Sequence, residues 1–508
     1  MLSLYLATTM LVTQGLWAFA KTFGGTSDEY GYSIVQTMDG GFAVAGFTQS
    51  FGAGGSDILV LKLAPDGSLI WARTYGGTSW DYAYSIIQTT DGGYAVAGMT
   101  YSFGYGDGDF IVLKLASNGS LTWARTFGNS GGGEYISSII QTTDGGYAVT
   151  GVGREAWTGN NLVVLKLAAD GSLTWSKTFS YSGYTEYPKS IIQTAEGGYA
   201  VAGYSGTISS SCAFFVFKIT SDGSLVWART YGGASSDWGC SIVQTTNGGY
   251  AVAGCTESFS TMERDILVLN LNSDGSLAWA RKYGGTYNDE AYSIIQTQDG
   301  GYAVAGGTYD GTRQYDYFVL KLASDGSVSW AKTLGGWNHE FAQSIIQTTD
   351  RGYAVTGWTW TFGAGGNDFL VLRLPSDGNY SGCVQNWSPT VTNVNPVATP
   401  VNVGADFSIY RFDPSLTITT PSPVITDVCE PYPLYVNETS PGSQVITYSP
   451  VPGGLLFVSP ETMGIKIYSA DGRLAYSGNL EKGQNRITLE TGVYLWQVGS
   501  YKGKAVVR

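Results

Sequence analysis

Seven acidic residues stand at the same place in seven successive segments of the chain, each four residues before the serine of an S-I-I/V-Q tetrapeptide. They are Glu29, Asp81, Glu134, Glu186, Asp237, Asp289 and Glu340. Carboxylates gathered in a concave site favour a cation or the hydroxyl groups of a sugar. The alternative is structural, because carboxylates also accept backbone N–H groups in turns. A position that every segment repeats favours the structural interpretation, since a single binding site does not require seven copies.

Five tryptophans depart from the repeated pattern, and they lie on or near expected loops. They are Trp157, Trp238, Trp337, Trp358 and Trp360. Aromatic rings on loops can stack against sugar rings or against a protein partner. The alternative is that each ring packs against its own loop. We take these five residues as the candidates for ligand binding.

Catalytic machinery is not indicated, because no nucleophile stands beside a base in the sequence. The single histidine, His339, precedes Glu340 in an expected surface loop. With one histidine and no paired C-x-x-C pattern, a transition-metal site is poorly supplied. We therefore predict no catalytic residues and no metal site.

Glycine-rich loops such as 104–109 and 363–368 contain oxygen donors that calcium could use. They lack the fixed ligand spacing and the closing glutamate of an EF-hand. In two of the repeats Asn161 and Ala213 replace the aspartate that ends the loop. We predict no cofactor and keep calcium as an alternative.

Five cysteines fall into two groups. Cys212, Cys240 and Cys255 lie in the fourth and fifth repeats, at positions that the other repeats do not share, and we expect buried thiols there. Cys383 and Cys429 flank a proline-rich stretch. We predict a disulfide between them, which in the chain-entropy model stabilises the fold by roughly 4 kcal/mol.

The elements that must position these residues follow from the repeat itself. The glutamine of the tetrapeptide recurs every 51 to 53 residues, at Gln36, Gln88, Gln141, Gln193, Gln244, Gln296 and Gln347. The unit from Ser85 to Thr126 shows the pattern: its turn signals, D-G-G at 91–93 and N-G-S at 118–120, are flanked by β-branched and aromatic residues, which predicts two hairpins. Four strands repeated at this period are typical of a β-propeller blade.

A W-A-R/K-T segment follows the second hairpin in six units, at Trp71, Trp123, Trp175, Trp227, Trp279 and Trp330, with W-S-K-T at Trp175. The seventh unit lacks this segment. The missing copy stands at the N-terminus, where residues 19–25 are FAKTFGG. We therefore predict a seven-bladed β-propeller over residues 16–382, closed by a strand from the N-terminus.

These units resemble the secreted repeat proteins of bacteria and archaea that carry WAKTFGG, SIIQTxDGGY and DFxVLKLDxDGxLxW in tandem. The resemblance covers residues 16–380. It implies a propeller and no particular ligand.

The repeat stops after residue 380, and twelve of the fifteen prolines lie beyond that point. Residues 383–452 are predicted to form a Pro/Thr-rich extended connector. Residues 453–508 contain a hairpin at 464–474, a G-V-Y strand at 492–494 and a K-A-V-V-R terminus at 504–508. This tail resembles the C-terminal sorting domain of the type IX secretion system, which implies a small β-sandwich, export by that machinery and, in many members of the family, removal of the domain.

The first residues, 1–15, form an apolar segment typical of a secretory signal peptide. Later stretches contain no apolar run long enough to span a bilayer. A net charge of −13 repels phosphate backbones, which excludes nucleic acid as a partner. We expect a secreted or cell-surface protein.

Taken together, the sequence predicts an all-β, exported and non-enzymatic protein that binds carbohydrate or a surface protein through its loops. Two alternatives stay open. One is a structural surface or adhesion component without a discrete ligand, and the other is a polysaccharide hydrolase or lyase.

Overall fold

The computed structural model describes residues 18–507 in two compact units that divide between Thr426 and Asp427. The internal stretches outside the description are 130–131, 156–158, 181–183, 207–210, 261–262, 310, 312–313, 381, 395, 401–409, 413–416, 420–423, 428–446, 452–453, 460–462, 470–473, 481–482, 489–491 and 499–500. The predicted signal peptide, 1–15, also lies outside the described residues. Within them, no helix has the length and apolarity that crossing a bilayer would require.

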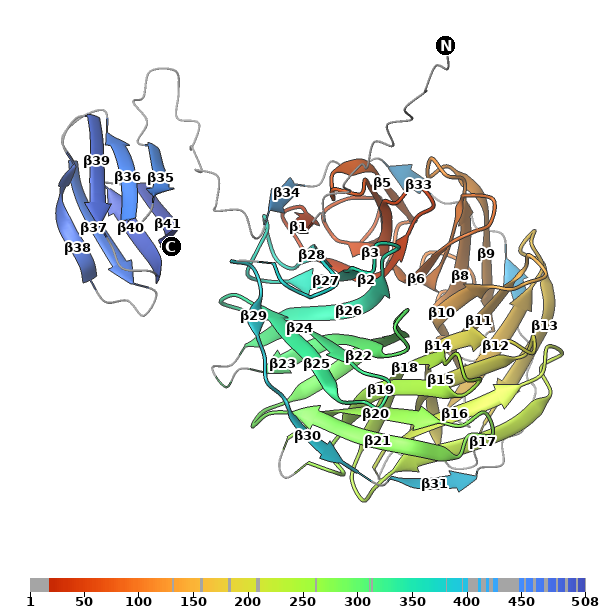
Figure 1. Ribbon diagram of the computed structural model, residues 1–508. Coiled ribbons are helices and arrows are strands. Elements are labelled where there is room, and N and C mark those ends of the chain that lie inside the picture. Colours follow the sequence, from red (N-terminus) through yellow and green to blue (C-terminus); the bar gives the residue numbers. More distant parts are fainter. Residues whose placement is uncertain are drawn as a thin grey trace, which may run out of the picture. The chain divides into compact units, whose positions relative to one another are not determined.

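The first unit is a ring of seven antiparallel sheets, which confirms the seven-bladed propeller (Figure 1). The innermost strands of blades 1 to 7 are, in order, β2 (Glu29–Gln36), β6 (Asp81–Gln88), β10 (Tyr135–Gln141), β14 (Thr185–Gln193), β18 (Asp237–Gln244), β22 (Asp289–Gln296) and β26 (Glu340–Gln347). The second strands are β3 (Phe42–Thr48), β7 (Tyr94–Thr100), β11 (Tyr147–Glu155), β15 (Tyr199–Gly206), β19 (Tyr250–Thr256), β23 (Tyr302–Tyr309) and β27 (Tyr353–Thr359).

The outer half of each blade is the second predicted hairpin. The third strands are β4 (Asp57–Leu63), β8 (Asp109–Leu115), β12 (Gly159–Leu167), β16 (Ala213–Ile219), β20 (Asp265–Leu271), β24 (Tyr315–Leu322) and β28 (Asp368–Leu374). The fourth strands of blades 1 to 6 are β5 (Leu69–Gly76), β9 (Leu121–Gly128), β13 (Leu173–Phe179), β17 (Leu225–Gly232), β21 (Leu277–Gly284) and β25 (Val328–Leu334).

The N-terminal strand β1 (Phe19–Gly24) supplies the fourth strand of blade 7, as predicted. It pairs antiparallel with β28, with Phe19 opposite Arg373 and Phe23 opposite Phe369. Phe19 then packs edge-on against Phe42 of blade 1 at a centroid distance of 6.0 Å. The same contact recurs around the ring between each repeat tryptophan and a tyrosine of the next blade, from Trp71–Tyr94 at 5.9 Å to Trp330–Tyr353 at 5.4 Å. The hydrophobic core therefore lies between blades.

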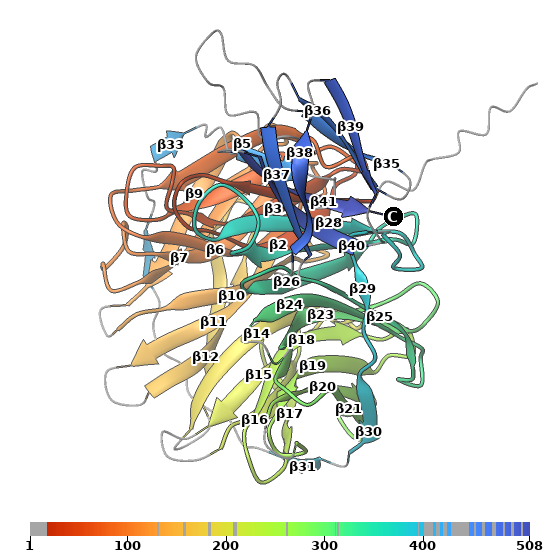
Figure 2. The same ribbon diagram turned by 90° about the vertical axis from the view of Figure 1, so that its left-hand side faces the viewer.

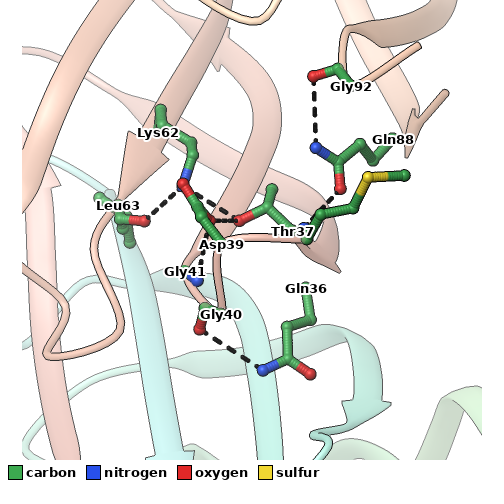
Figure 3. Close-up of polar contacts among 10 residues, drawn as sticks. Gln36, Thr37, Asp39, Gly40, Gly41, Lys62, Leu63, Gln88 and Gly92 are labelled. Carbon is green, nitrogen blue, oxygen red and sulfur yellow. Dashed lines mark hydrogen bonds and ion pairs between the residues drawn. The ribbon is translucent and has the colours of Figure 1, made fainter. Parts of the chain in front are cut away.

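The repeated tetrapeptide links each blade to its neighbour. The Oε1 atom of Gln88 in blade 2 accepts the N–H of Met38 in blade 1 at 2.8 Å, while its Nε2 donates to the Gly92 carbonyl within blade 2 (Figure 3). Equivalent bonds join all seven blades, and the bond from the Thr349 N–H to Gln36 at 2.9 Å closes the ring. The invariance of this glutamine is thus explained by ring assembly.

We expected an extended connector from residue 383 onward, and the described parts of residues 385–427 include short strands that pair with the blades. Over this stretch short strands extend the outer edges of the blades; we call them the belt. They are β29 (Gln385–Asn386), β30 (Thr390–Asn393), β31 (Val397–Pro400), β32 (Tyr410–Phe412), β33 (Thr417–Thr419) and β34 (Val424–Asp427). They add to blades 6, 5, 4, 2, 1 and 7 in that order, against the direction of the blades. Figure 2 shows β29, β30 and β31 along the outer edges of blades 6, 5 and 4. Backbone pairing with exposed edges explains how so polar a stretch is ordered.

The second unit contains two antiparallel sheets. One has the order β35 (Thr447–Val451), β36 (Gly454–Ser459) and β39 (Gly483–Thr488). The other has the order β38 (Leu474–Leu480), β37 (Met463–Ser469), β40 (Gly492–Val498) and β41 (Tyr501–Val507). Ile465, Ile467 and Ile487 are buried. The sorting role of this unit stays a prediction.

Cys383 is disulfide-bonded, whereas Cys212, Cys240 and Cys255 are free thiols. Cys429 lies outside the described residues, so its pairing with Cys383 stays a prediction. The belt begins on blade 6, just after Cys383, and its last strand before Cys429 lies on the neighbouring blade 7. A bond between these two cysteines would therefore close the belt into a covalent hoop.

We expect Cys383→Ser to lower the melting temperature, because it opens a loop whose closure stabilises the fold by about 4 kcal/mol. Calorimetry with and without a thiol reductant measures the effect, and the reductant should have little effect on the variant. A non-reducing peptide map that pairs Cys383 with any cysteine other than Cys429 contradicts the hoop.

Candidate functional site

A β-bulge interrupts the innermost strand of every blade directly before the serine of the tetrapeptide. In blade 1 the register shifts between Gly31 and Ser33, so that Tyr32 has no partner on β3. A bulge of this kind re-aims a side chain out of the sheet. The bulged residues are Tyr32, Tyr84, Ser137, Lys189, Cys240, Tyr292 and Gln343.

All seven bulged residues line one cavity, which has a volume of about 660 Å³. This lies within the range of roughly 300–1,000 Å³ that small-molecule sites occupy. Because the innermost strands of all seven blades contribute, the cavity is the central channel of the propeller. Trp238, Cys255 and Arg264 also line it, near the blade edge where the innermost strands begin.

The channel wall is chemically uneven. Blades 1 and 2 contribute tyrosines, among them Tyr32 and Tyr84, whose ring centroids lie 5.2 Å apart. Burial is the largest cause that raises the pKa of both phenols, so their hydroxyl groups stay protonated. Blades 4 to 6 contribute the charges, so the two sides of the channel offer different contacts to a ligand.

Arg264 organises the charged side. Its guanidinium lies 2.7 Å from Glu290 and 3.2 Å from Glu257, and its Cζ stands 4.4 Å from the ring centroid of Trp238. The Tyr292 hydroxyl donates to Glu290 at 2.5 Å. These contacts neutralise Arg264 and hold Trp238, one of the five candidate tryptophans, against the channel.

Cys240 and Cys255 add two thiols to the same wall. Burial raises the pKa of the Cys240 thiol to about 11, and the positive charge of Lys189 opposes that shift. Burial also raises the pKa of Cys255. Both groups are therefore protonated at neutral pH.

The exposed tryptophans lie on the face where the channel begins. Trp337 lies between β25 and β26, and Trp360 follows β27, so antiparallel geometry brings them to the same edge of their blades. Their side chains are 54% and 53% exposed. The Trp360 N–H donates to the His339 carbonyl at 2.9 Å, and the His339 ring stacks on Trp360. Trp337 precedes His339 by two residues in the same loop, and we call Trp337, His339 and Trp360 the loop cluster.

The remaining candidate tryptophans differ in position. Trp358 is half-buried and packs between Tyr30 and Phe341, at centroid distances of 5.2 and 4.8 Å. Trp157 lies outside the described residues.

Sequence reasoning missed Trp80, which is 52% exposed in the loop before β6 on the same face. Gly55 permits its approach, because a Cβ atom there would lie 2.4 Å from the indole Nε1. It also missed the seven bulged residues around the channel, which we call the bulged ring. The available signal was the residue before the repeated serine, which varies between units whereas the S-I-I/V-Q tetrapeptide after it does not.

The seven acidic residues are all buried, at most 4% exposed. Glu29 accepts the Gly25 N–H at 2.7 Å and the Thr48 hydroxyl at 2.7 Å. Asp81, Asp237, Asp289 and Glu340 accept the equivalent glycine N–H groups at 2.8 to 2.9 Å. In these five positions the carboxylate holds the loop between two blades.

The aspartates that end the glycine-rich loops are also hydrogen-bonded. Asp57 accepts two loop N–H groups, from Ala53 at 3.0 Å and from Gly54 at 3.1 Å. Asp368 accepts the Ala364 N–H at 2.9 Å. Within the described residues, no group of three histidine, cysteine or acidic side chains is arranged to hold a metal ion.

Burial raises the pKa of Asp289 and of Glu340 to about 7 and that of Glu134 to about 9. Acids whose pKa is higher in the folded state stabilise the protein at low pH, and this stability is lost as pH rises through the folded pKa. We therefore expect the melting temperature to fall from pH 5 to pH 9, with roughly 3 kcal/mol at most from Asp289, because its pKa of about 7 lies about two units above the start of this range. Calorimetry across this range measures it.

Asp289→Asn should flatten this pH dependence, because asparagine does not ionise and keeps an oxygen for the Gly285 N–H. Asp222→Asn, at an exposed hairpin acid, is the matched control and should leave the slope unchanged. An Asp289→Asn profile that parallels the wild type would contradict the assignment.

No protein-family model and no curated protein matches the chain. A structure of Sqt1 from Chaetomium thermophilum is 14% identical and aligns 69% of this chain with 85% of that one, at a TM-score of 0.41. The periplasmic gluconolactonase PpgL of Pseudomonas aeruginosa is also 14% identical, with 63% and 95% covered and a TM-score of 0.41. A protein of unknown function from Dyadobacter fermentans is 10% identical, with 70% and 97% covered and a TM-score of 0.40. At these identities and TM-scores the similarity carries no argument about activity.

Proposed function

We propose that this chain is an exported, non-enzymatic propeller that binds carbohydrate at the cell surface through the face on which its channel begins. The observation that carries the proposal is the loop cluster of Trp337, His339 and Trp360. Two half-exposed indoles on one face offer large apolar surfaces to a ligand. Sugar rings present matching apolar faces, and aromatic side chains cover large areas in such contacts.

The loop cluster is also held in place before any ligand arrives. Glu340 accepts the Gly336 N–H at 2.9 Å and the Thr359 hydroxyl at 2.9 Å. The Thr361 hydroxyl oxygen accepts the N–H groups of Trp337 at 3.0 Å and of Asn338 at 2.8 Å. Loops fixed in this way lose little conformational entropy on binding, which favours affinity.

Export rests on the sequence. The apolar N-terminal segment and the resemblance of residues 453–508 to a sorting domain support it. The C-terminal unit would engage the secretion machinery, and the propeller would then act as a secreted or surface-attached binding module.

We expect Trp337→Ala and Trp360→Ala each to weaken glycan binding at least tenfold, about 1.4 kcal/mol, because each removes a stacking surface. A glycan array identifies the ligand, and titration calorimetry measures the affinity. Met38→Ala is the control, since Met38 is 72% exposed in a hairpin at the opposite edge of its blade. Full binding by the double tryptophan variant would contradict the proposal.

The mature N-terminus is expected near Leu16. Cleavage after Ala20 would remove the first two of the six residues of β1, whose pairing with β28 closes the ring. Intact mass and N-terminal sequencing of protein from the culture medium and from the cell surface measure the start, and they also show whether residues 453–508 are lost. A mature protein that begins at Lys21 would exclude this role for β1.

A further inference from the structure

Lys189 is the cationic member of the bulged ring, whose other six members are tyrosine, serine, cysteine and glutamine. The bulge between Pro188 and Ser190 turns it toward the channel, which it lines. Its Nζ lies 5.6 Å from the ring centroid of Tyr204. The side chain is half-buried, so its ammonium group faces a confined space.

Within the described residues, Lys189 forms no ion pair. Glu290, the carboxylate among the described residues that line the channel, is already bound by Arg264 and by the Tyr292 hydroxyl. A single cation without a counter-ion in a confined site favours a ligand with one negative charge. A phosphate monoester is a poorer match, because its second charge would lie unpaired near Glu290.

The rest of the wall suits the ring and hydroxyl groups of a sugar. Tyr32, Tyr84 and Tyr135 offer aromatic faces and protonated hydroxyl groups, because burial raises the pKa of all three. Ser137 and Gln343 add neutral hydrogen-bonding groups. This combination of one cation, several neutral polar groups and aromatic surface is what an acidic sugar requires.

We propose that the channel binds the acidic residue of a uronic-acid saccharide, with the carboxylate on Lys189 and the sugar ring against the tyrosines. This inference rests on the proposed carbohydrate binding and extends it to a substrate class and to a second contact site. The loop cluster would hold the neutral part of the saccharide, and the channel would select for its negative charge.

The test compares di- and trisaccharides of glucuronate and galacturonate with their methyl esters, which keep the sugar and lose the charge. Titration calorimetry on the full-length protein should give at least tenfold tighter binding of the acids. Lys189→Met should abolish that preference and leave ester binding unchanged. Lys189→Arg should retain it, and Lys466→Met, at an exposed lysine of the second unit, is the control.

A second readout locates the ligand. Cys240 lines the channel, and Lys189 lowers the pKa of its thiol. Methylthiolation of Cys240, followed by peptide mass mapping, should slow in Lys189→Met because less thiolate forms. Bound uronate should protect Cys240 in the wild type.

The outcomes separate the two proposals. Equal affinity for acids and esters, with no effect of Lys189→Met, overturns the channel site and leaves carbohydrate binding intact. A preference for acids that persists in Lys189→Met, with Cys240 unprotected, also overturns it. Absence of binding to any saccharide by the folded protein overturns both.

Discussion

Closure of the ring is the constraint on which the rest of the structure depends. A blade buries its faces only against two neighbours, so an open row would leave the outer faces of blades 1 and 7 exposed. The chain meets this need with backbone pairing of β1 to β28 and with the Gln36–Thr349 hydrogen bond. Phe19, Phe23 and Phe42 then pack with Phe369 in one core cluster across the junction. Without that junction there is no channel and hence no site.

Polar contacts that recur from blade to blade show why a residue repeated in every blade should be given a structural role and not a ligand-binding one. In blade 1 the buried Lys62 pairs with Asp39 at 2.9 Å and ties the first hairpin to the third strand (Figure 3). In blade 5 both partners change together: Asn247 replaces the acid, and Asn270 replaces the lysine and donates to the Tyr302 hydroxyl at 2.7 Å. A lone buried charge would be costly, so the paired change keeps the local fold without a charge. The acidic residues before the repeated serines are assigned a structural role for the same reason.

Much of the architecture could be predicted because the sequence of each blade repeats at a nearly constant spacing. The blades follow from the spacing of the glutamines, and the closing strand follows from the missing W-A-R/K-T copy. The channel residues could not be predicted in the same way. Strand alternation assigns a face to each residue, but the bulge at Tyr32 and Lys189 breaks that alternation. The belt was missed because it pairs through backbone groups, which leave no hydrophobic period in the sequence. Of the candidate tryptophans, Trp337 and Trp360 are exposed, whereas Trp358 is half-buried between Tyr30 and Phe341.

The bulge also explains how one scaffold can carry a specific site. A residue at this position makes no cross-strand pair, and its side chain lines the channel. Its identity can therefore change without disturbing the ladder or the core, in contrast to the serine beside it, whose hydroxyl in blade 1 accepts the Ile86 N–H of blade 2 at 3.1 Å. Seven such positions surround one cavity. A change at one of them alters the ligand that the channel accepts, while the six other blades keep the ring closed. Specificity in this fold is thus expected where the repeat varies, and Lys189 is the clearest case.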